Sequence, residues 1–323
     1  MTLRDEVGQL SWWTRETLNL TVLRRMMRVR RNQHLPRLRR SRRIKGHVWA
    51  VTMVRDEVDI IEHTVRHLLT QGVDHVLVAD NLSTDGTRHL LDDLASRDPR
   101  VHIAVDDEPA YYQSEKMTRL ARAAWRAGAD WVIPFDADEL WFACGQSLKE
   151  YLSSLSADSS NIEATIAMSH ARMHDGVPTG GPQPPVTAPI MTDSTPTLPG
   201  KVAIRTHPLM VVVMGNHGAK RVGTVDYGLR LVHLQYRSLA HVERKAKQGW
   251  EALRLADAPE DVGIHWEALQ SLSRNDLDEV WKQMQDGVAQ PAVHFQAGGP
   301  MVQIQPLSWS SWDPNGQIQD PTL

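Results

Sequence analysis

Three carboxylates stand close together directly after a short apolar run in the middle of the chain. The run from Trp131 to Phe135 has the length and composition of a buried strand, and Asp136, Asp138 and Glu139 follow it. In an extended chain, side chains at positions i and i+2 point to the same side, so Asp136 and Asp138 can aim at one point beyond the strand. Carboxylates placed in this way suit Mg²⁺ or Mn²⁺, cations that also bind substrate phosphates. The alternative is a polar loop in which Asp138 or Glu139 caps a helix.

The segments that precede this motif alternate between apolar runs of strand length and amphipathic stretches of helix length. Strands are expected at 47–54, 75–79, 101–105 and 131–135, with helices at 58–70, from 87 onward, and at 113–127. This alternation predicts a parallel sheet that is covered by helices on both faces. Each expected strand ends in acidic or polar residues, and ligands of such sheets bind at the carboxyl ends of the strands. The sequence therefore predicts one polar site at that edge.

The second half of the chain gives weaker patterns. Strands are expected at 162–171, 201–205, 209–213 and 229–234, and helices at 147–155, 239–255 and 275–285. Residues 176–200 are rich in Pro, Gly and Thr and predict a long loop. We therefore divide the chain into a basic amphipathic helical arm at 1–45, a main domain at 46–290 and an irregular tail at 291–323. The main domain has an expected nucleotide-binding half at 46–145 and an acceptor half at 146–290.

Three motifs in sequence order resemble family 2 glycosyltransferases of the GT-A fold. They are Val51 to Glu57, Ala79 to Thr87 and Phe135 to Glu139, and the last is similar to a branch whose acidic motif reads Asp-x-Asp-Glu. The resemblance is good over about 48–141 and looser over 201–245. It implies an α/β fold with a mostly parallel sheet and helices on both faces. The basic N-terminal helix and the C-terminal helices would be additions to that fold.

The resemblance also implies an activity and a set of site residues. A sugar would move from a nucleotide-diphosphate sugar, with a UDP-sugar preferred, to an acceptor hydroxyl with inversion. Asp80 could instead be a turn-forming residue. Lys116 could reach a phosphate, or it could be a solvated helix residue. The residues expected at the nucleotide sugar are Arg55, Glu57, Asp80, Asn81, Lys116 and Asp136.

The same resemblance implies a metal site and leaves the general base open. Asp136, Asp138 and His233 are the expected ligands of Mn²⁺ or Mg²⁺. An inverting transfer needs a base that deprotonates the acceptor hydroxyl, and the downstream chain shows no clear acidic motif for it. His217, which lies between two glycines in a tight turn, and Asp175 are the candidates. His217 could equally be a metal ligand or a satisfied structural group.

The arm at 1–45 differs sharply in charge from the rest of the chain. It holds 13 Lys and Arg against 3 Asp and Glu, a net charge of +10, while the remainder holds 23 basic and 36 acidic residues, a net charge of −13. Its apolar residues recur at helical spacing up to Pro36. Such a helix suits an anionic membrane surface, a nucleic-acid backbone as a less favoured partner, or the acidic body of the protein itself.

Composition narrows the class of protein and its expected compartment. The chain of 323 residues is 41% hydrophobic and 23% charged, as in an ordinary globular enzyme. Its single cysteine, Cys144, excludes an intramolecular disulfide and any multi-cysteine zinc site. No apolar run approaches the length of about 18 residues that a membrane span needs. We expect a cytoplasmic protein, with membrane contact at the inner face through residues 10–45 as an option.

Two other classes of function compete with the glycosyltransferase. A nucleotidyltransferase on a similar sheet would normally carry a glycine-rich, basic phosphate loop near the first strand, but this strand ends in Arg55, Asp56 and Glu57 with no glycine. A non-enzymatic scaffold that binds membrane or nucleic acid through the arm would leave the acidic cluster unexplained.

Overall fold

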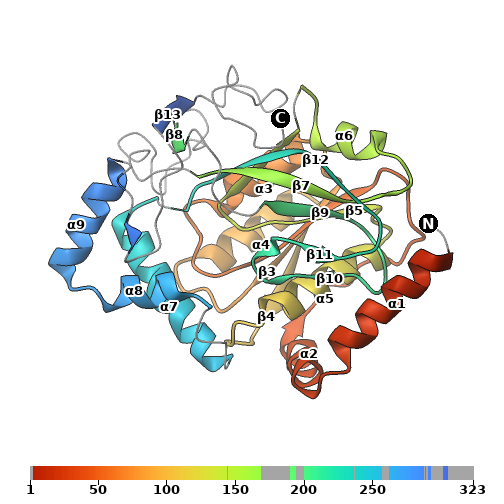
Figure 1. Cartoon of the computed structure of the whole chain (residues 1–323), viewed down its shortest axis with the longest axis horizontal. Helices are drawn as coiled ribbons and strands as arrows, with labels where there is room; N and C mark the ends of the chain where they lie inside the picture. Colours follow the sequence, from red (N-terminus) through yellow and green to blue (C-terminus); the bar gives the residue numbers. More distant parts are fainter. Residues whose placement is uncertain are drawn as a thin grey trace.

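One mixed sheet runs through the centre of the protein (Figure 1). The computed structural model describes residues 3–143, 145–168, 190–193, 200–235, 237–256, 262–286, 288, 290–291 and 301–304. Within them, the large sheet has nine strands in the order β1-β4-β3-β2-β5-β9-β7-β12-β6. Its strands are β1 (Gln33–His34), β2 (Val48–Val54), β3 (His75–Asp80), β4 (Val101–Asp106), β5 (Trp131–Pro134), β6 (Glu139–Ala143), β7 (Ser159–Met168), β9 (Lys201–Arg205) and β12 (Thr224–His233).

The first half of this sheet is parallel and has helices on both faces. Strands β4, β3, β2 and β5 are parallel neighbours. Val48 and Ala50 of β2 join the core that contains α3 (Ile61–Thr70) and α4 (Thr87–Arg97), whereas Trp49 and Val51 join the core that contains α5 (Gln113–Arg126). Alternate residues of one strand thus enter opposite cores, as a sheet covered on both sides requires. The predicted α/β fold is confirmed.

The apolar faces of the helices hold them on the sheet. Ile61 and Leu68 of α3 are seven residues apart, lie on one face of the helix, and are both fully buried. Burying an aliphatic side chain of this size contributes about 1.5–3 kcal/mol relative to leaving it exposed. Helix α3 begins three residues later than the sequence indicated, because Val58 to Ile60 form a turn instead of a helical start. That turn places Glu57 at the sheet edge.

The second half of the sheet brings a distant segment back to the acidic motif. Strand β12 pairs in parallel with β7 and antiparallel with β6, and His233 lies opposite Glu139 in the antiparallel register. Strand β6 was not predicted, although all five of its residues are buried. The acidic motif therefore lies in a tight connection between two strands of one sheet, and β12 delivers His233 directly to it.

Additional helices and two small sheets surround the second half. Helix α6 (Leu148–Ser154) begins with a capping box formed by Ser147 and Glu150, and α7 (Leu239–Leu255) begins at Ser238, whose side chain accepts from the backbone N–H of His241. Helix α8 (Ile264–Ser271) was not predicted, and α9 (Arg274–Gln285) was predicted to within one residue. The small sheets pair β10 (Val211–Val212) with β11 (Ala219–Lys220), and β13 (Met301–Ile304) with β8 (Ile190–Asp193). Strand β13 lies in the segment that was expected to be irregular.

The basic arm forms two helices that pack on the body. Helix α1 (Leu3–Thr17) ends before Leu18, and the side chain of Asn19 caps α2 (Leu20–Asn32), so the single helix expected there is wrong. Gln9 of α1 donates to the carbonyl oxygens of Leu209 and Lys220, both at 2.9 Å. Contact between the arm and the body, one of the three alternatives left open by the sequence, is therefore present. In the part of the chain that the structure describes, every helix is too short or too polar to cross a bilayer.

Candidate active site

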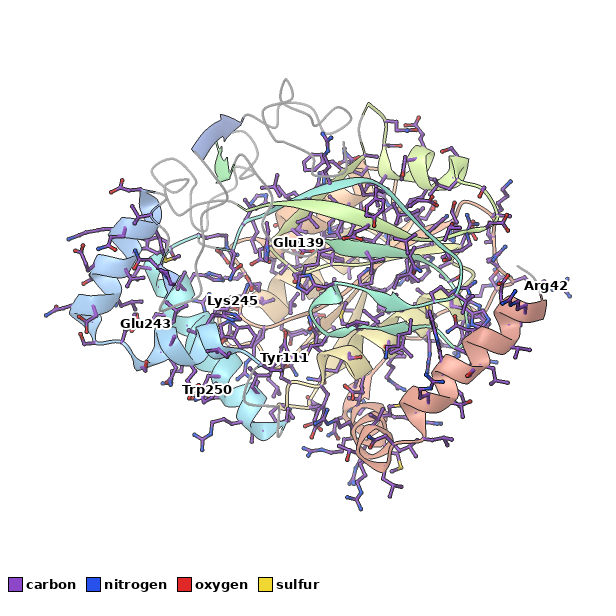
Figure 2. The ribbon with its side chains drawn as sticks, in the orientation of Figure 1. Arg42, Tyr111, Glu139, Glu243, Lys245 and Trp250 are labelled. Carbon is purple, nitrogen blue, oxygen red and sulfur yellow. The ribbon has the colours of Figure 1, made fainter. Side chains whose placement is uncertain are left out.

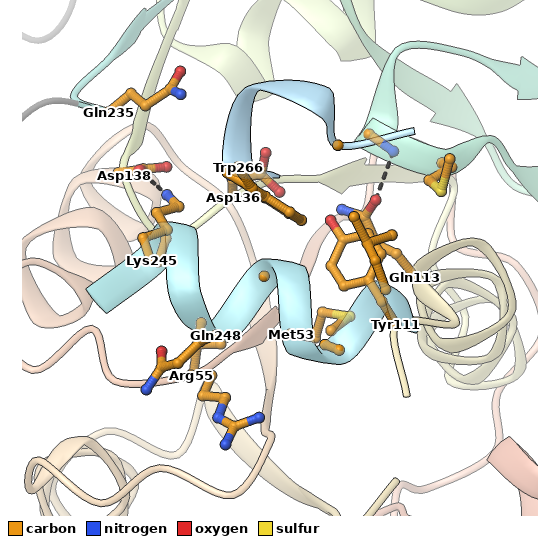
Figure 3. Close-up of a pocket in the computed structure, with 18 of the residues that line it drawn as sticks. Met53, Arg55, Tyr111, Gln113, Asp136, Asp138, Gln235, Lys245, Gln248 and Trp266 are labelled. Atoms are coloured by element: carbon orange, nitrogen blue, oxygen red, sulfur yellow. Dashed lines mark hydrogen bonds and ion pairs between the residues drawn. The ribbon is translucent and has the colours of Figure 1, made fainter. Parts of the chain in front are cut away.

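A cavity of about 690 Å³ lies at the carboxyl ends of the parallel strands, between the sheet and helices α7 and α8 (Figure 3). It occupies the edge of the sheet that the sequence indicated. Asp80 and Lys116 are not among its lining residues, and Asp175 lies outside the described residues. The predicted site residues that line it are Arg55, Glu57, Asn81, Asp136, Asp138, His217 and His233.

Asp136 lies where β5 ends and is bound from three directions. Its Oδ2 lies 2.7 Å from Lys201 Nζ, and its Oδ1 accepts from the side-chain amide of Asn216 at 3.0 Å. Its backbone N–H donates to Glu139 Oε2 at 3.0 Å, which fixes the turn. Burial alone would raise the pKa of Asp136, but the Lys201 ammonium outweighs it and keeps the pKa below its ordinary value. Asp136 is therefore held as a carboxylate that faces the cavity.

Asp138 is more enclosed than its position at a strand end indicated. Its side chain is buried, with Oδ2 at 2.7 Å from Lys245 Nζ and Oδ1 at 3.2 Å from His233 Nε2. Arg237 and Lys245 of α7 cover its carboxylate. Burial alone would raise the pKa of this carboxyl group, but Lys245 and His233 hold it well below its ordinary value. The ion pair to Lys245 crosses the cavity floor (Figure 3).

Three side chains at this edge have the composition and spacing of a divalent-cation site. One ligand atom each from Asp136, Glu139 and His233 lies within 4.8 Å of the others. Two carboxylate oxygens and an imidazole nitrogen suit Mn²⁺ and, with water ligands, Mg²⁺. Asp138 contacts His233 instead of joining this group, so the third member is Glu139. Its signal in the sequence was its place directly after Asp138.

Lys201 occupies the space between two of these carboxylates. Its ammonium lies 2.7 Å from Asp136 Oδ2 and 2.9 Å from Glu139 Oε1, and it donates to the carbonyl oxygen of Gly215 at 2.6 Å. Burial alone would lower the pKa of Lys201, but the two carboxylates outweigh it and raise the pKa above its ordinary value. A permanently charged ammonium thus stands at the position that a metal ion would approach.

Glu57 anchors a buried ionic network at the end of β2. It pairs with Arg237, which also binds Asp59 at 2.8 Å, and with His241 at 3.4 Å. Burial alone would raise the pKa of Glu57, but Arg237 and Lys245 lower it to about 2. The network joins the β2 end to α7, on which Lys245 lies. Figure 2 labels Lys245 and Tyr111 near the space between α7 and the sheet.

Two of the residues expected at the nucleotide, Arg55 and Asn81, line the cavity, and Asp80 stands at the end of β3 directly before Asn81. Arg55 projects from the end of β2, and its Nε is buried without a hydrogen-bond partner among the described residues. Asn81 donates to the carbonyl oxygens of Asp106 and Glu108 at 2.9 and 2.8 Å. The Oδ1 of Asp80 is also buried without a hydrogen-bond partner there, and burial raises the pKa of Asp80. These buried polar atoms are the kind that a ligand satisfies.

Lys116 is used inside the fold. It is fully buried on α5, with its ammonium 3.0 Å from Asp106 and 2.6 Å from the carbonyl oxygen of Glu108. The residue thus ties α5 to the end of β4, away from the cavity. Its position four residues before Leu120 already placed it on the apolar face of the helix.

His217 also lines the cavity. The chain reaches it through the short 3₁₀ helix Met214–Asn216, in which Gly215 and Asn216 both adopt positive φ angles, 77° and 58°. This tight turn lets Asn216 reach Asp136 while the ring Nδ1 of His217 contacts the carbonyl oxygen of Gly200 at 3.1 Å. The turn therefore links a base candidate to the acidic motif.

Several lining residues were not found from the sequence. Tyr111 and Trp266 meet edge to face, with ring centroids 5.5 Å apart, and form an aromatic wall (Figure 3). Lys201 and Lys245 are the unpredicted cations. No local pattern separates these lysines from surface lysines, because their role depends on the pairing of distant strands.

Comparisons with known proteins agree with this geometry. Residues 49–159 match the family model of glycosyl transferase family 2. The chain is 33% identical over 96 residues to the Bacillus subtilis (strain 168) protein TuaG, whose name describes a glycosyltransferase of teichuronic acid biosynthesis. That match covers 29% of this chain and 36% of TuaG, so the chain matches about a third of the length of this relative.

Two solved structures resemble the chain at lower similarity. S. aureus TarS 1-349 in complex with UDP is 13% identical, with 71% of this chain and 73% of that chain covered and a TM-score of 0.36. Mannosyltransferase PcManGT from Pyrobaculum calidifontis, in complex with GDP-Man and Mn²⁺, is 15% identical, with 89% and 88% covered and a TM-score of 0.35. At these TM-scores, neither likeness adds to the argument. The family match at residues 49–159 confirms the resemblance seen in the motifs. Residues 49–159 of the chain thus match glycosyl transferase family 2.

Proposed function

We propose that the protein is a glycosyltransferase that moves a sugar from a nucleotide-diphosphate sugar to an acceptor hydroxyl, with inversion. The observation that carries this proposal is the convergence of Asp136, Glu139 and His233 at the cavity, in and beside the family 2 segment. TuaG, which is 33% identical to the chain over 96 residues, is named for glycosyl transfer.

The side chains at the acidic motif fit a divalent cation, Mn²⁺ or Mg²⁺. Asp136, Glu139 and His233 would hold it, and Asp138 would orient the imidazole through its contact of 3.2 Å with His233. When bound, the cation supplies positive charge that neutralises the diphosphate leaving group. The sequence predicts Asp138 as a direct ligand, whereas we propose Glu139 for that place because one of its carboxylate oxygens lies within 4.8 Å of ligand atoms of Asp136 and His233.

The chain's own cations would hold the remaining charge of the donor. Arg55 can donate to a phosphate or a base carbonyl at the end of β2. Lys245 lies 2.7 Å from Asp138 and lines the same cavity, so it can turn between the carboxylate and a phosphate oxygen. Asp80 and the side-chain oxygen of Asn81 would accept hydrogen bonds from the nucleoside at the β3 end. A uracil base, which offers one imide N–H, fits an acceptor such as Asp80, and for this reason we prefer a UDP-sugar.

His217 is the best-placed described candidate for the general base. It lines the cavity, and Asn216 beside it binds Asp136 at 3.0 Å. A ring nitrogen there could take the proton of an acceptor hydroxyl while the nucleoside diphosphate leaves on the opposite side of the sugar. Asp175 remains a second candidate. The aromatic wall of Tyr111 and Trp266 would enclose the reacting sugar and exclude water.

A donor screen with released nucleoside diphosphate as its readout tests the proposal. We expect release with one nucleotide-sugar class in the presence of Mn²⁺ or Mg²⁺, and its loss when a chelator removes the metal. Release of inorganic pyrophosphate instead would favour nucleotidyl transfer. Failure of every nucleotide sugar to bind by calorimetry would contradict the proposal.

A further inference from the structure

Each of the two N-terminal helices packs on the body through one flank. On α1, Gln9 binds the β10–β11 region and Glu6 lies 3.0 Å from His207. On α2, Val29 is buried, and Arg28 forms an ion pair with Glu108 at 2.8 Å. These contacts explain why the arm is attached to the body. They leave the opposite flanks of both helices facing away from it (Figure 1).

The opposite flanks carry large apolar side chains that the fold does not bury. Val7 and Leu10 of α1 are 61% and 51% exposed, and Leu18, in the link between the helices, is 68% exposed. Leu20 and Met27 of α2 are 71% and 62% exposed. Because a helix advances about 100° per residue, positions seven apart such as Leu20 and Met27 lie nearly above one another. The apolar residues therefore form stripes directed away from the body.

Arginines border these stripes and give the flanks a strong positive charge. Arg24 and Arg31 of α2 are exposed and lie one turn or less from Leu20 and Met27. Arg15 and Arg30 are also exposed, and the chain continues into a run of exposed basic residues at 37–45. Arg25 and Arg28, in contrast, face Tyr112 on the body side. Two arginines of α2 thus serve the fold, while Arg24 and Arg31 are exposed beside the apolar stripe.

We propose that this outward flank docks on an anionic phospholipid surface. The flank consists of Val7, Leu10, Leu18, Leu20 and Met27 together with Arg15, Arg24, Arg30 and Arg31. Its charge is opposite to that of the lipid headgroups, and its aliphatic side chains can enter the boundary between headgroups and acyl chains. A nucleic-acid backbone would match the arginines but would leave the apolar stripes in water. The same helices can therefore bind the body and a membrane at once, through different faces.

Vesicle co-sedimentation tests this proposal without reference to sugar transfer. We expect the full chain to bind phosphatidylcholine vesicles that contain phosphatidylglycerol, to bind pure phosphatidylcholine vesicles at least about tenfold more weakly, and to be released by salt. The double variants Leu20→Ser/Met27→Ser and Arg24→Gln/Arg31→Gln should each weaken binding about tenfold or more. Circular dichroism should show that both retain the fold, since all four residues are exposed.

A matched control separates docking through this flank from nonspecific adsorption of exposed apolar side chains to vesicles. Val225 and Tyr227 are 51% and 54% exposed on β12, far from the arm in sequence, and Val225→Ser/Tyr227→Ser should bind vesicles like the wild type. No binding of the wild type to anionic vesicles would overturn the proposal, as would equal loss in the control. It would also be overturned if only the arginine variant lost binding and duplex DNA bound with the same pattern, because that result identifies a polyanion site. None of these outcomes bears on the glycosyltransferase proposal.

Discussion

The two ends of the parallel strands contain similar residue types but differ in how those residues are used. Strand β3 begins at His75 and ends at Asp80, and β4 carries His102 near its start and Asp106 at its end. At the amino ends, the ring nitrogens of His75 and His102 lie 3.1 Å apart, and Trp49 stacks on His102 at 5.3 Å. At the carboxyl ends, the polar groups surround a cavity of about 690 Å³.

The difference shows what separates a structural polar cluster from a candidate site. At the amino ends, polar groups meet one another, as in the pair of Asp74 with Lys149 and His47. At the carboxyl ends, buried atoms of Arg55 and Asp80 have no hydrogen-bond partner among the described residues. Residue type alone does not distinguish the two edges, whereas the open volume beside the polar groups of the carboxyl edge does.

The largest expected effect comes from removing one charge at the carboxyl edge. Asp136→Asn should lower turnover by at least about a hundredfold, because such electrostatic groups typically contribute 10²–10³ in rate. The readout is nucleoside diphosphate release at saturating Mn²⁺. Asp74→Asn at the amino edge should leave turnover unchanged and lower the free energy of unfolding by about 1–3 kcal/mol, since Asp74 accepts from the backbone of Val48. Near-normal turnover in Asp136→Asn would contradict the functional distinction between the edges.

The two ends of β3 give a second test. Asp80→Ala should weaken donor binding about tenfold to a hundredfold, because a charged hydrogen bond to a ligand typically contributes about 1.5–3 kcal/mol. His75→Asn, at the start of the same strand, should leave the donor dissociation constant unchanged. Calorimetry with the nucleotide sugar measures both. An unchanged constant in Asp80→Ala would remove Asp80 from the nucleotide site.

Replacing Lys201 should strengthen the binding of Mn²⁺. Lys201→Met removes the ammonium that stands between Asp136 and Glu139, so Mn²⁺ affinity should rise by about tenfold, the scale of one nearby charge. His233→Ala should change the affinity in the opposite direction. Both effects can be measured by Mn²⁺ titration of the protein alone. If Lys201→Met weakens Mn²⁺ binding, the lysine supports the metal site and does not compete with it.

The smallest expected effect is a pH dependence of stability at the amino edge. Burial lowers the pKa of His75 and of His102 below the ordinary 6.5. Below pH 6.5 the unfolded chain therefore binds more protons than the folded protein, and stability should fall as pH decreases through this range. Urea unfolding at pH 7 and pH 5.5 measures the loss, which should be smaller in His102→Gln. The exposed His89→Gln is the control and should behave like the wild type.

Local patterns were sufficient to predict the first half of the fold. The apolar runs predicted β2, β3, β4 and β5 to within about two residues, because each is a short apolar run, and β2, β3 and β5 are almost entirely buried. Asp136 and His233 were also brought together as expected. Periodicity failed at β6, where the buried run Leu140 to Ala143 follows directly on the acidic motif.

The remainder of the site depends on pairings that no single segment reveals. Glu139 meets His233 because β12 and β6 pair in one register, and a shift by one residue would turn both away from the cavity. Lys201 and Lys245 come from β9 and α7, and their partners are known only once those elements are placed. Lys116 had a local signal in its spacing from Leu120, which indicated an inward position.

The pairing of β12 with β6 also determines when the active centre can form during synthesis of the chain. A nascent chain that has just completed the family 2 segment at residue 159 contains all three sequence motifs, but it lacks His233 and Lys245. Contacts between segments so distant in sequence form slowly, because the loop between them must close first. The active centre should therefore be assembled only after the C-terminal part of the chain has been synthesised, so truncated products would be inactive even where their first half folds.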